Sequence, residues 1–206
     1  MKRAKTSKAW MKEHVNDFFV KQAKKDGYRS RAAYKLLEII ERDHILKPGM
    51  IVVDLGAAPG SWSQVVRHKV GNGGKIIALD ILDMQPLPGV EFIQNDFREE
   101  CAIDELKKHL NGYHPDLVIS DMSPNISGIV VSDQARSMYL AELALVFALE
   151  QLNYGGNFLV KVFQGRDFDQ FLRDMRAGFN SVIIRKPKAS RDRSNELYLL
   201  GLDKKK

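Results

Sequence analysis

Short apolar runs alternate with amphipathic segments along this chain, and that alternation restricts the possible folds more than any other feature. Helical periodicity predicts helices over 61–70, 99–110, 132–152 and 167–178, and Ser30 is expected to cap another helix before Lys47-Pro48-Gly49. The strand-like runs are 50–55, 75–79, 90–94, 116–120, 156–163, 181–185 and 196–201. Strands that alternate with helices pair in parallel through right-handed crossovers. The sequence therefore predicts an α/β fold, a mostly parallel doubly wound sheet whose last strand is antiparallel.

The overall composition points to a single intracellular domain. A length of 206 residues with 44% hydrophobic residues is enough for one core. The single Cys101 excludes an internal disulfide, and we expect it to be a small buried residue. No signal-peptide pattern is present, and no apolar run approaches the roughly 20 residues that cross a bilayer. We therefore expect a cytoplasmic protein, not bound to membranes, that is a monomer.

Positive charge is concentrated at the N-terminus. Residues 1–35 contain 11 lysines and arginines but 3 acidic residues, so they carry +8 of a chain whose total is +6. A second basic cluster lies at 185–193. Local positive charge of this kind is typical of a surface that binds a polyanion, although a solvated tail is the simpler interpretation. We predict a basic N-terminal extension over 1–27, an RNA partner, and a catalytic domain over 28–206.

Three predicted strands end in residues suited to binding an adenosine. The first ends in Asp-Leu-Gly-Ala-Ala-Pro-Gly at 54–60, the second in Asp80 and the third in Asn95-Asp96. Open α/β sheets bind ligands beyond the carboxyl ends of their strands. Asp80 is placed to accept hydrogen bonds from ribose hydroxyls, and Asp96 lies near the expected edge of an adenine. The pattern predicts a cofactor that contains adenosine.

The glycine pattern helps to decide which cofactor this is. A nicotinamide dinucleotide predicts G-x-G-x-x-G and a nucleoside triphosphate predicts G-x-x-x-x-G-K-[ST], and neither is present. S-adenosylmethionine has no phosphate to bind and is compatible with the looser G-A-A-P-G. Alternatively, Gly56 and Gly60 simply shape a tight turn. We expect S-adenosylmethionine, and no metal site is predicted.

Four charged residues are expected to meet at the same edge of the sheet. Lys35 lies on the helix before the first strand, Asp121 follows the fourth strand, Lys161 interrupts an apolar strand, and Glu196 begins the last strand. A lysine in a buried strand requires a reason, because an unpaired buried charge is costly. The simpler interpretations are an edge-strand lysine, a loop cap, a solvated helix face and a strand-end charge. Flanked by Asp121 and Glu196, Lys161 can orient a ribose hydroxyl and, when neutral, take its proton.

Three motifs resemble one enzyme family over nearly the whole chain, from Tyr28 to Tyr198. They read VVDLGAAPG at 52–60, SDMSPNISG at 120–128 and VKVFQG at 160–165. The chain resembles the FtsJ/RlmE family of 23S ribosomal RNA 2′-O-ribose methyltransferases. One departure is Ser61, where that family usually has a second glycine, which affects the loop on the methionine side of the cofactor.

The resemblance implies a Rossmann-like methyltransferase fold and assigns functional residues. A Lys-Asp-Lys-Glu tetrad corresponds to Lys35, Asp121, Lys161 and Glu196, with Lys161 similar to the proton-accepting lysine. The implied cofactor contacts are Gly60, Trp62, Asp80, Asp96 and Asp121. The implied substrate is a uridine in 23S rRNA of the large ribosomal subunit. A tRNA 2′-O-methyltransferase, a non-catalytic RNA-binding module and an NAD-dependent oxidoreductase are the alternatives.

Overall fold

The computed structural model describes residues 17–125, 127–165, 167–191 and 194–206. Its helices are α2 (Phe18–Asp26), α3 (Ala33–Asp43), α4 (Ser61–Val70), α5 (Glu100–Leu110), α6 (Val130–Gln151) and α7 (Phe168–Gly178). Its strands are β1 (Ile51–Leu55), β2 (Lys75–Asp80), β3 (Glu91–Gln94), β4 (Leu117–Ser120), β5 (Asn157–Phe163), β6 (Phe179–Arg185) and β7 (Glu196–Lys204). All seven predicted strands and all five predicted helices are present, with ends that differ by up to three residues.

The seven strands form one sheet in the order β3-β2-β1-β4-β5-β7-β6. Strands β3, β2, β1, β4 and β5 pair in parallel, whereas β7 runs antiparallel to both of its neighbours, β5 and β6. This confirms the predicted α/β class and the antiparallel pairing of the last two strands. The strand order reverses between β1 and β4, and ligands bind beyond the carboxyl ends of strands at such a point.

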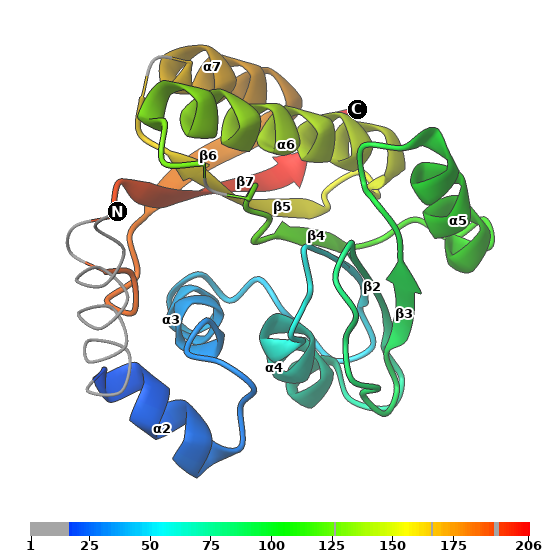
Figure 1. Cartoon of the computed structure of the whole chain (residues 1–206). Helices are drawn as coiled ribbons and strands as arrows, with labels where there is room; N and C mark the ends of the chain where they lie inside the picture. The colour runs from blue at the N-terminus through cyan, green and yellow to red at the C-terminus, as the bar shows by residue number, and fades with distance from the viewer. Residues whose placement is uncertain (1–16, 126, 166, 192–193) are drawn as a thin grey trace.

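Helices cover both faces of the sheet (Figure 1). On one face α3 and α4 bury a cluster that includes Leu36, Trp62 and Tyr198. On the other face α5, α6 and α7 bury a larger cluster that includes Phe147 and Phe171. Alternate residues of each strand point to opposite faces, so the sequence of a strand decides which side chains meet α3 and α4.

Two local expectations were wrong. Helix α3 begins at Ala33 after Ala32, which makes no side-chain cap. The Ser30 hydroxyl instead accepts from the Ala32 N–H at 3.2 Å, one turn earlier, and contacts the Ser61 hydroxyl at 2.7 Å. Cys101 is exposed because the apolar stripe of α5 that faces the sheet runs through Ala102 rather than through the cysteine.

The described part of the predicted basic extension contains one helix. The Asp17 carboxylate caps α2 by accepting from the N–H groups of Phe19 at 2.9 Å and Val20 at 3.3 Å. Asp17 also pairs with Arg31 at 3.1 Å, so α2 is attached to the segment before α3. Residues 1–16, which hold the rest of the predicted extension, lie outside the described residues. Among the helices that the structure describes, none is both long and apolar enough to cross a membrane.

Candidate active site

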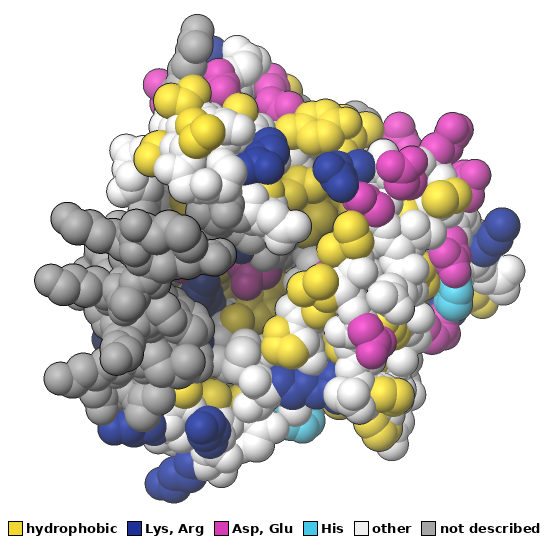
Figure 2. All heavy atoms as spheres, viewed as in Figure 1, with side chains coloured by type: hydrophobic (Ala, Val, Ile, Leu, Met, Phe, Trp, Pro, Cys, Tyr) yellow, Lys and Arg dark blue, Asp and Glu magenta, His cyan; other side chains and the backbone are white. Residues whose placement is uncertain are grey.

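The predicted site residues gather at the carboxyl ends of β1, β2, β4 and β5. Figure 2 shows a hollow on this face, with acidic and basic side chains at its floor and apolar side chains around it. Strand pairing explains the gathering. Lys161 on β5 lies opposite Tyr198 on β7, and Val160 lies opposite Ser120 at the end of β4. Asp121 therefore follows β4 level with Lys161.

Lys161 is a buried, paired lysine. Its side chain lies on a strand with a neighbour on each side, and the residue is 9% exposed, which rules out a lysine at an exposed sheet edge. The Lys161 amine lies 3.1 Å from the Asp121 carboxylate and donates to the Asp121 carbonyl oxygen at 2.6 Å. The cost of burying this charge is offset by an ion pair and a hydrogen bond to the same residue.

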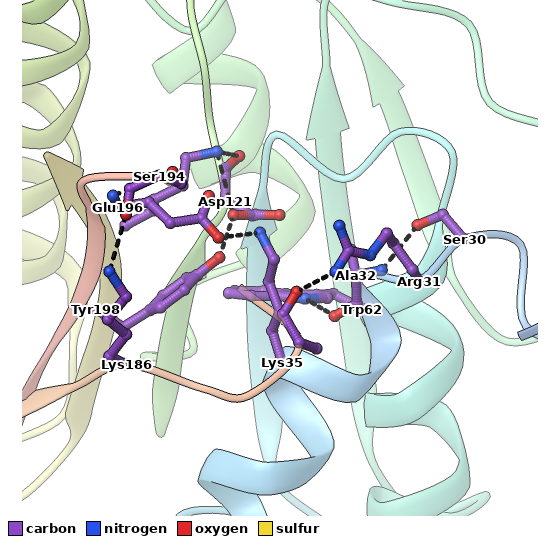
Figure 3. Close-up of polar contacts among 12 residues, drawn as sticks. Ser30, Arg31, Ala32, Lys35, Trp62, Asp121, Lys186, Ser194, Glu196 and Tyr198 are labelled. Atoms are coloured by element: carbon purple, nitrogen blue, oxygen red, sulfur yellow. Dashed lines mark hydrogen bonds and ion pairs between the residues drawn. The ribbon is translucent and has the colours of Figure 1, made fainter. Parts of the chain in front are cut away.

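Lys35 and Glu196 form the second ion pair of the site. Their amine and carboxylate lie 2.7 Å apart, with Lys35 on α3 reaching toward the start of β7 (Figure 3). The sequence predicted that Glu196 would flank Lys161, but the structure pairs it with Lys35. The reason is geometric: Glu196 lies opposite Phe163, two residues past Lys161 along β5 and directly below the end of α3's reach.

Tyr198 joins the two ion pairs. Its hydroxyl donates to the Asp121 carboxylate at 2.8 Å, and the Lys35 amine lies 5.7 Å from the centre of its ring (Figure 3). Sequence reasoning did not assign this tyrosine a role. A signal was available, because Glu196 and Tyr198 are two residues apart on one strand and must share a face. The four predicted residues and Tyr198 thus form one connected cluster.

The electrostatics of the cluster favour an ionised Asp121. Burial acts to raise the pKa of Asp121, but the charges of Lys161 and Lys35 and the hydrogen bond from Tyr198 outweigh it and lower this pKa. Burial, followed by the nearby charges of Asp121 and Glu196, raises the pKa of Tyr198 well above its usual value. Tyr198 therefore remains a hydrogen-bond donor and Asp121 remains an acceptor.

The loop between β1 and α4 requires glycine at two positions. Gly56 has φ 78°, and a Cβ there would lie 2.7 Å from the Met122 side chain. Gly60 has φ 103° and is the N-cap of α4, where a Cβ would lie 2.6 Å from the Arg29 guanidinium. Both glycines therefore shape a tight turn, as the simpler interpretation required, and this turn brings the backbone to the edge of the hollow.

Asp80 braces this loop. One of its carboxylate oxygens accepts from the Ala58 N–H at 2.9 Å, and the other accepts from the Leu82 N–H at 2.8 Å. Each carboxylate oxygen has a second lone pair, so Asp80 keeps acceptor capacity for ribose hydroxyls. This arrangement fits an adenosine ribose.

Trp62 and Asp96 are engaged in different ways. The Trp62 indole N–H donates to the Ala32 carbonyl at 2.9 Å, and its ring centre lies 5.7 Å from that of Tyr198. The Trp62 side chain thus belongs to the core below the tetrad. The Asp96 carboxylate pairs with the exposed Arg98, and the hydrogen bonds from that guanidinium lower the pKa of Asp96.

Asp54 is a further buried acid that the sequence reasoning left without a role. It is fully buried on β1, and the Ser63 hydroxyl donates to its Oδ2 at 2.6 Å. Its Oδ1 is buried without a hydrogen-bond partner. Burial, partly opposed by Ser63, raises the pKa of Asp54 to about 7. The described residues contain no group of three or more His, Cys, Asp or Glu side chains arranged to hold a metal ion.

Comparison with known proteins shows what class of protein this fold and site define. The model of the FtsJ-like methyltransferase family matches residues 28–204. Over 205 residues the chain is 69% identical to "Ribosomal RNA large subunit methyltransferase E" of Nitrosospira multiformis, and the alignment covers 100% of both chains. The protein of the same name from Nitrosomonas eutropha is 66% identical over 204 residues, 99% of each chain.

A solved structure agrees. The crystal structure of a ribosomal RNA methyltransferase from Plasmodium falciparum is 32% identical, with a TM-score of 0.77, and the match covers 86% of this chain and 98% of that one. The fold and site are thus those of a Rossmann-like methyltransferase. The chain belongs to the FtsJ-like methyltransferase family. The predicted fold, family and enzyme class are confirmed, and the NAD-dependent oxidoreductase is set aside.

Proposed function

We propose that this methyltransferase transfers a methyl group from S-adenosylmethionine to a ribose 2′-hydroxyl of large-subunit ribosomal RNA, on a uridine of the 23S rRNA. One observation carries the proposal: Lys161 is buried and paired with Asp121 at the edge of the sheet where ligands bind. The names of the relatives from Nitrosospira and Nitrosomonas support ribosomal RNA of the large subunit as the substrate. The observed contacts of the tetrad support a hydroxyl as the acceptor.

The cofactor contacts follow the loops after β1, β2 and β3. S-adenosylmethionine supplies a methyl group activated by a positively charged sulfur. The turn at Gly60 and the backbone of Trp62 would hold its amino-acid end at the start of α4. Asp80 would accept from the ribose hydroxyls, Asp96 would face the adenine, and Asp121 would close the pocket beside the tetrad. The two required glycines and the spare lone pairs of Asp80 support this assignment.

The tetrad would orient the acceptor hydroxyl and receive its proton. Methyl transfer is an in-line displacement, so the 2′-oxygen must be held against the methyl carbon. The Lys161 amine is fixed by Asp121 and can direct this oxygen; in its neutral form it takes the proton as the new C–O bond forms. Lys35, held by Glu196, would act on the same ribose or its phosphate.

The organisation of the chain is also proposed. Residues 1–27 would form a basic extension that contacts RNA phosphates, and residues 28–206 would form the catalytic domain. The described end of α2 carries Lys24 and Lys25 in its last turn, which supports an RNA contact there. We infer that the protein acts in the cytoplasm as a monomer.

A labelling experiment tests the acceptor atom. The purified protein is incubated with radiolabelled S-adenosylmethionine and either large-subunit RNA or total tRNA, and the RNA is hydrolysed with alkali. A 2′-O-methyl group blocks the internal attack that cleaves RNA, so we expect label in an alkali-resistant dinucleotide from the large-subunit RNA. Label in mononucleotides would make a base the acceptor, and label in the tRNA alone would favour the tRNA alternative.

A further inference from the structure

Arg29 lies outside the predicted site, yet its side chain connects the two loops that flank the proposed cofactor pocket. Its Nη1 donates to the carbonyl oxygens of Pro59 at 2.9 Å and Gln85 at 2.7 Å, and its Nη2 donates to that of Pro86 at 2.9 Å. Pro59 belongs to the loop after β1, and Gln85 and Pro86 belong to the loop after β2. The guanidinium is therefore held at the junction of these loops.

The charge of Arg29 has neutral partners. Its three acceptors are carbonyl oxygens, and no carboxylate of the described residues lies within ion-pair distance. A guanidinium has five N–H groups and stays protonated in proteins, so two donors take no part in these bonds. Every other arginine that the structure ties to a partner between α2 and α3 has an acid: Arg31 pairs with Asp17.

The position of the guanidinium is defined by Gly60. A Cβ on Gly60 would lie 2.6 Å from Arg29 Nη1, so the charge lies directly against the N-cap of α4. The N-terminus of a helix also favours negative charge, because its first N–H groups point outward. Two independent features therefore attract an anion to the same end of the pocket.

The backbone of this segment is fixed as well. The Arg29 N–H donates to the Gln64 side-chain oxygen at 2.8 Å, and the Gln64 amide donates to the Gly27 carbonyl at 3.0 Å. The next residue, Ser30, contacts Ser61 at 2.7 Å. Because the segment is already fixed to the first turn of α4, little ordering is needed when a ligand binds.

We propose that Arg29 is a binding residue for the amino-acid end of the methyl donor, with its guanidinium as the counter-charge of the α-carboxylate. This rests on the proposed function, which places that end of S-adenosylmethionine beside Gly60. An arginine and a carboxylate form charge-assisted hydrogen bonds of matching geometry. Contact with an RNA phosphate is the competing role. The three bonds that hold the guanidinium to the cofactor loops favour the carboxylate.

The test compares two ligands by calorimetry on the full-length protein. S-adenosylmethionine has the carboxylate, whereas 5′-deoxy-5′-methylthioadenosine has the same adenosine and sulfur but no amino-acid part. We expect Arg29→Gln to weaken S-adenosylmethionine binding roughly 10- to 100-fold, as for a lost charged hydrogen bond, and to change methylthioadenosine binding less than about twofold. Arg67→Gln is the matched control, because Arg67 donates to Gly71 and Asn72 at the other end of α4.

Each outcome is decisive. An equal loss for both ligands would mean that Arg29 only braces the loops, and the proposal would be overturned. Unchanged binding of both, with weaker RNA binding, would assign Arg29 to phosphate instead. Binding of neither ligand by the unaltered protein would refute the proposed cofactor itself. If Arg29→Gln does not fold, Arg29→Lys keeps the charge without the fork, and we expect a smaller loss, again confined to S-adenosylmethionine.

Discussion

Asp54 gives a quantitative prediction about stability and pH. The carboxyl is fully buried on β1, one of its oxygens has no hydrogen-bond partner, and burial raises its pKa from 3.8 to about 7. An acid whose pKa is higher in the folded state binds its proton more tightly there than when unfolded. The free energy of unfolding therefore decreases as the pH rises from about 4 to about 7, and it stays low above that range.

The size of the effect follows from the shift in pKa. Each pKa unit corresponds to about 1.4 kcal/mol, so a shift of about 3 units costs about 4 kcal/mol once Asp54 is ionised above pH 7. The Asp54→Asn variant cannot ionise at this position. Relative to the unaltered protein, its stability should therefore increase by about 2–3 kcal/mol more at pH 8 than at pH 5.

Urea denaturation of both proteins at pH 5 and pH 8 measures this difference. All other titrating groups are shared by the two proteins, so the double difference isolates Asp54. Asp104→Asn, at an exposed position on α5, is the control and should give the same difference at both pH values. An identical pH dependence for Asp54→Asn and the unaltered protein would show that Asp54 does not titrate in this range, and the reasoning from burial would fail.

Three further predictions test the proposed site. Lys161→Ala should abolish methyl transfer while calorimetry finds S-adenosylmethionine affinity nearly unchanged, and Glu196→Ala should reduce activity less; substantial turnover by Lys161→Ala would contradict its role. Asp80→Ala should weaken S-adenosylmethionine binding by about 1.5–3 kcal/mol, as for a lost charged hydrogen bond, and equal affinity would remove Asp80 from the pocket. Deletion of residues 1–27 should weaken RNA binding and flatten its salt dependence by roughly 0.7–0.9 in log–log slope per lost phosphate contact, while cofactor binding survives; an unchanged slope would mean a solvated tail.

The sequence by itself determined the sheet and the edge where the site lies. Strand-like runs separated by helical periodicity allow few topologies, because parallel crossovers are right-handed and short. The same pattern located Asp80, Asp121 and Lys161, since the carboxyl ends of parallel strands meet at one edge. The requirement for glycine at Gly56 and Gly60 was also visible in the G-A-A-P-G pattern.

Only the tertiary structure decided which charges pair. Lys161 pairs with Asp121, and Glu196 pairs with Lys35 instead of flanking Lys161. These partners are set by the register of β5 against β7 and by the way α3 packs across the sheet, and neither is encoded in a local pattern. The bond between Tyr198 and Asp121 has the same origin.

The position of Arg29 depends on tertiary structure for a similar reason. In the sequence it is one of many basic residues near the N-terminus, and its charge suggests a polyanion. In the fold its guanidinium reaches carbonyl oxygens 30, 56 and 57 residues away, on two loops beside Gly60. Composition reports how much charge a segment carries. The chain path decides which group that charge meets, because an ion pair or a hydrogen bond needs its partner within a few ångströms.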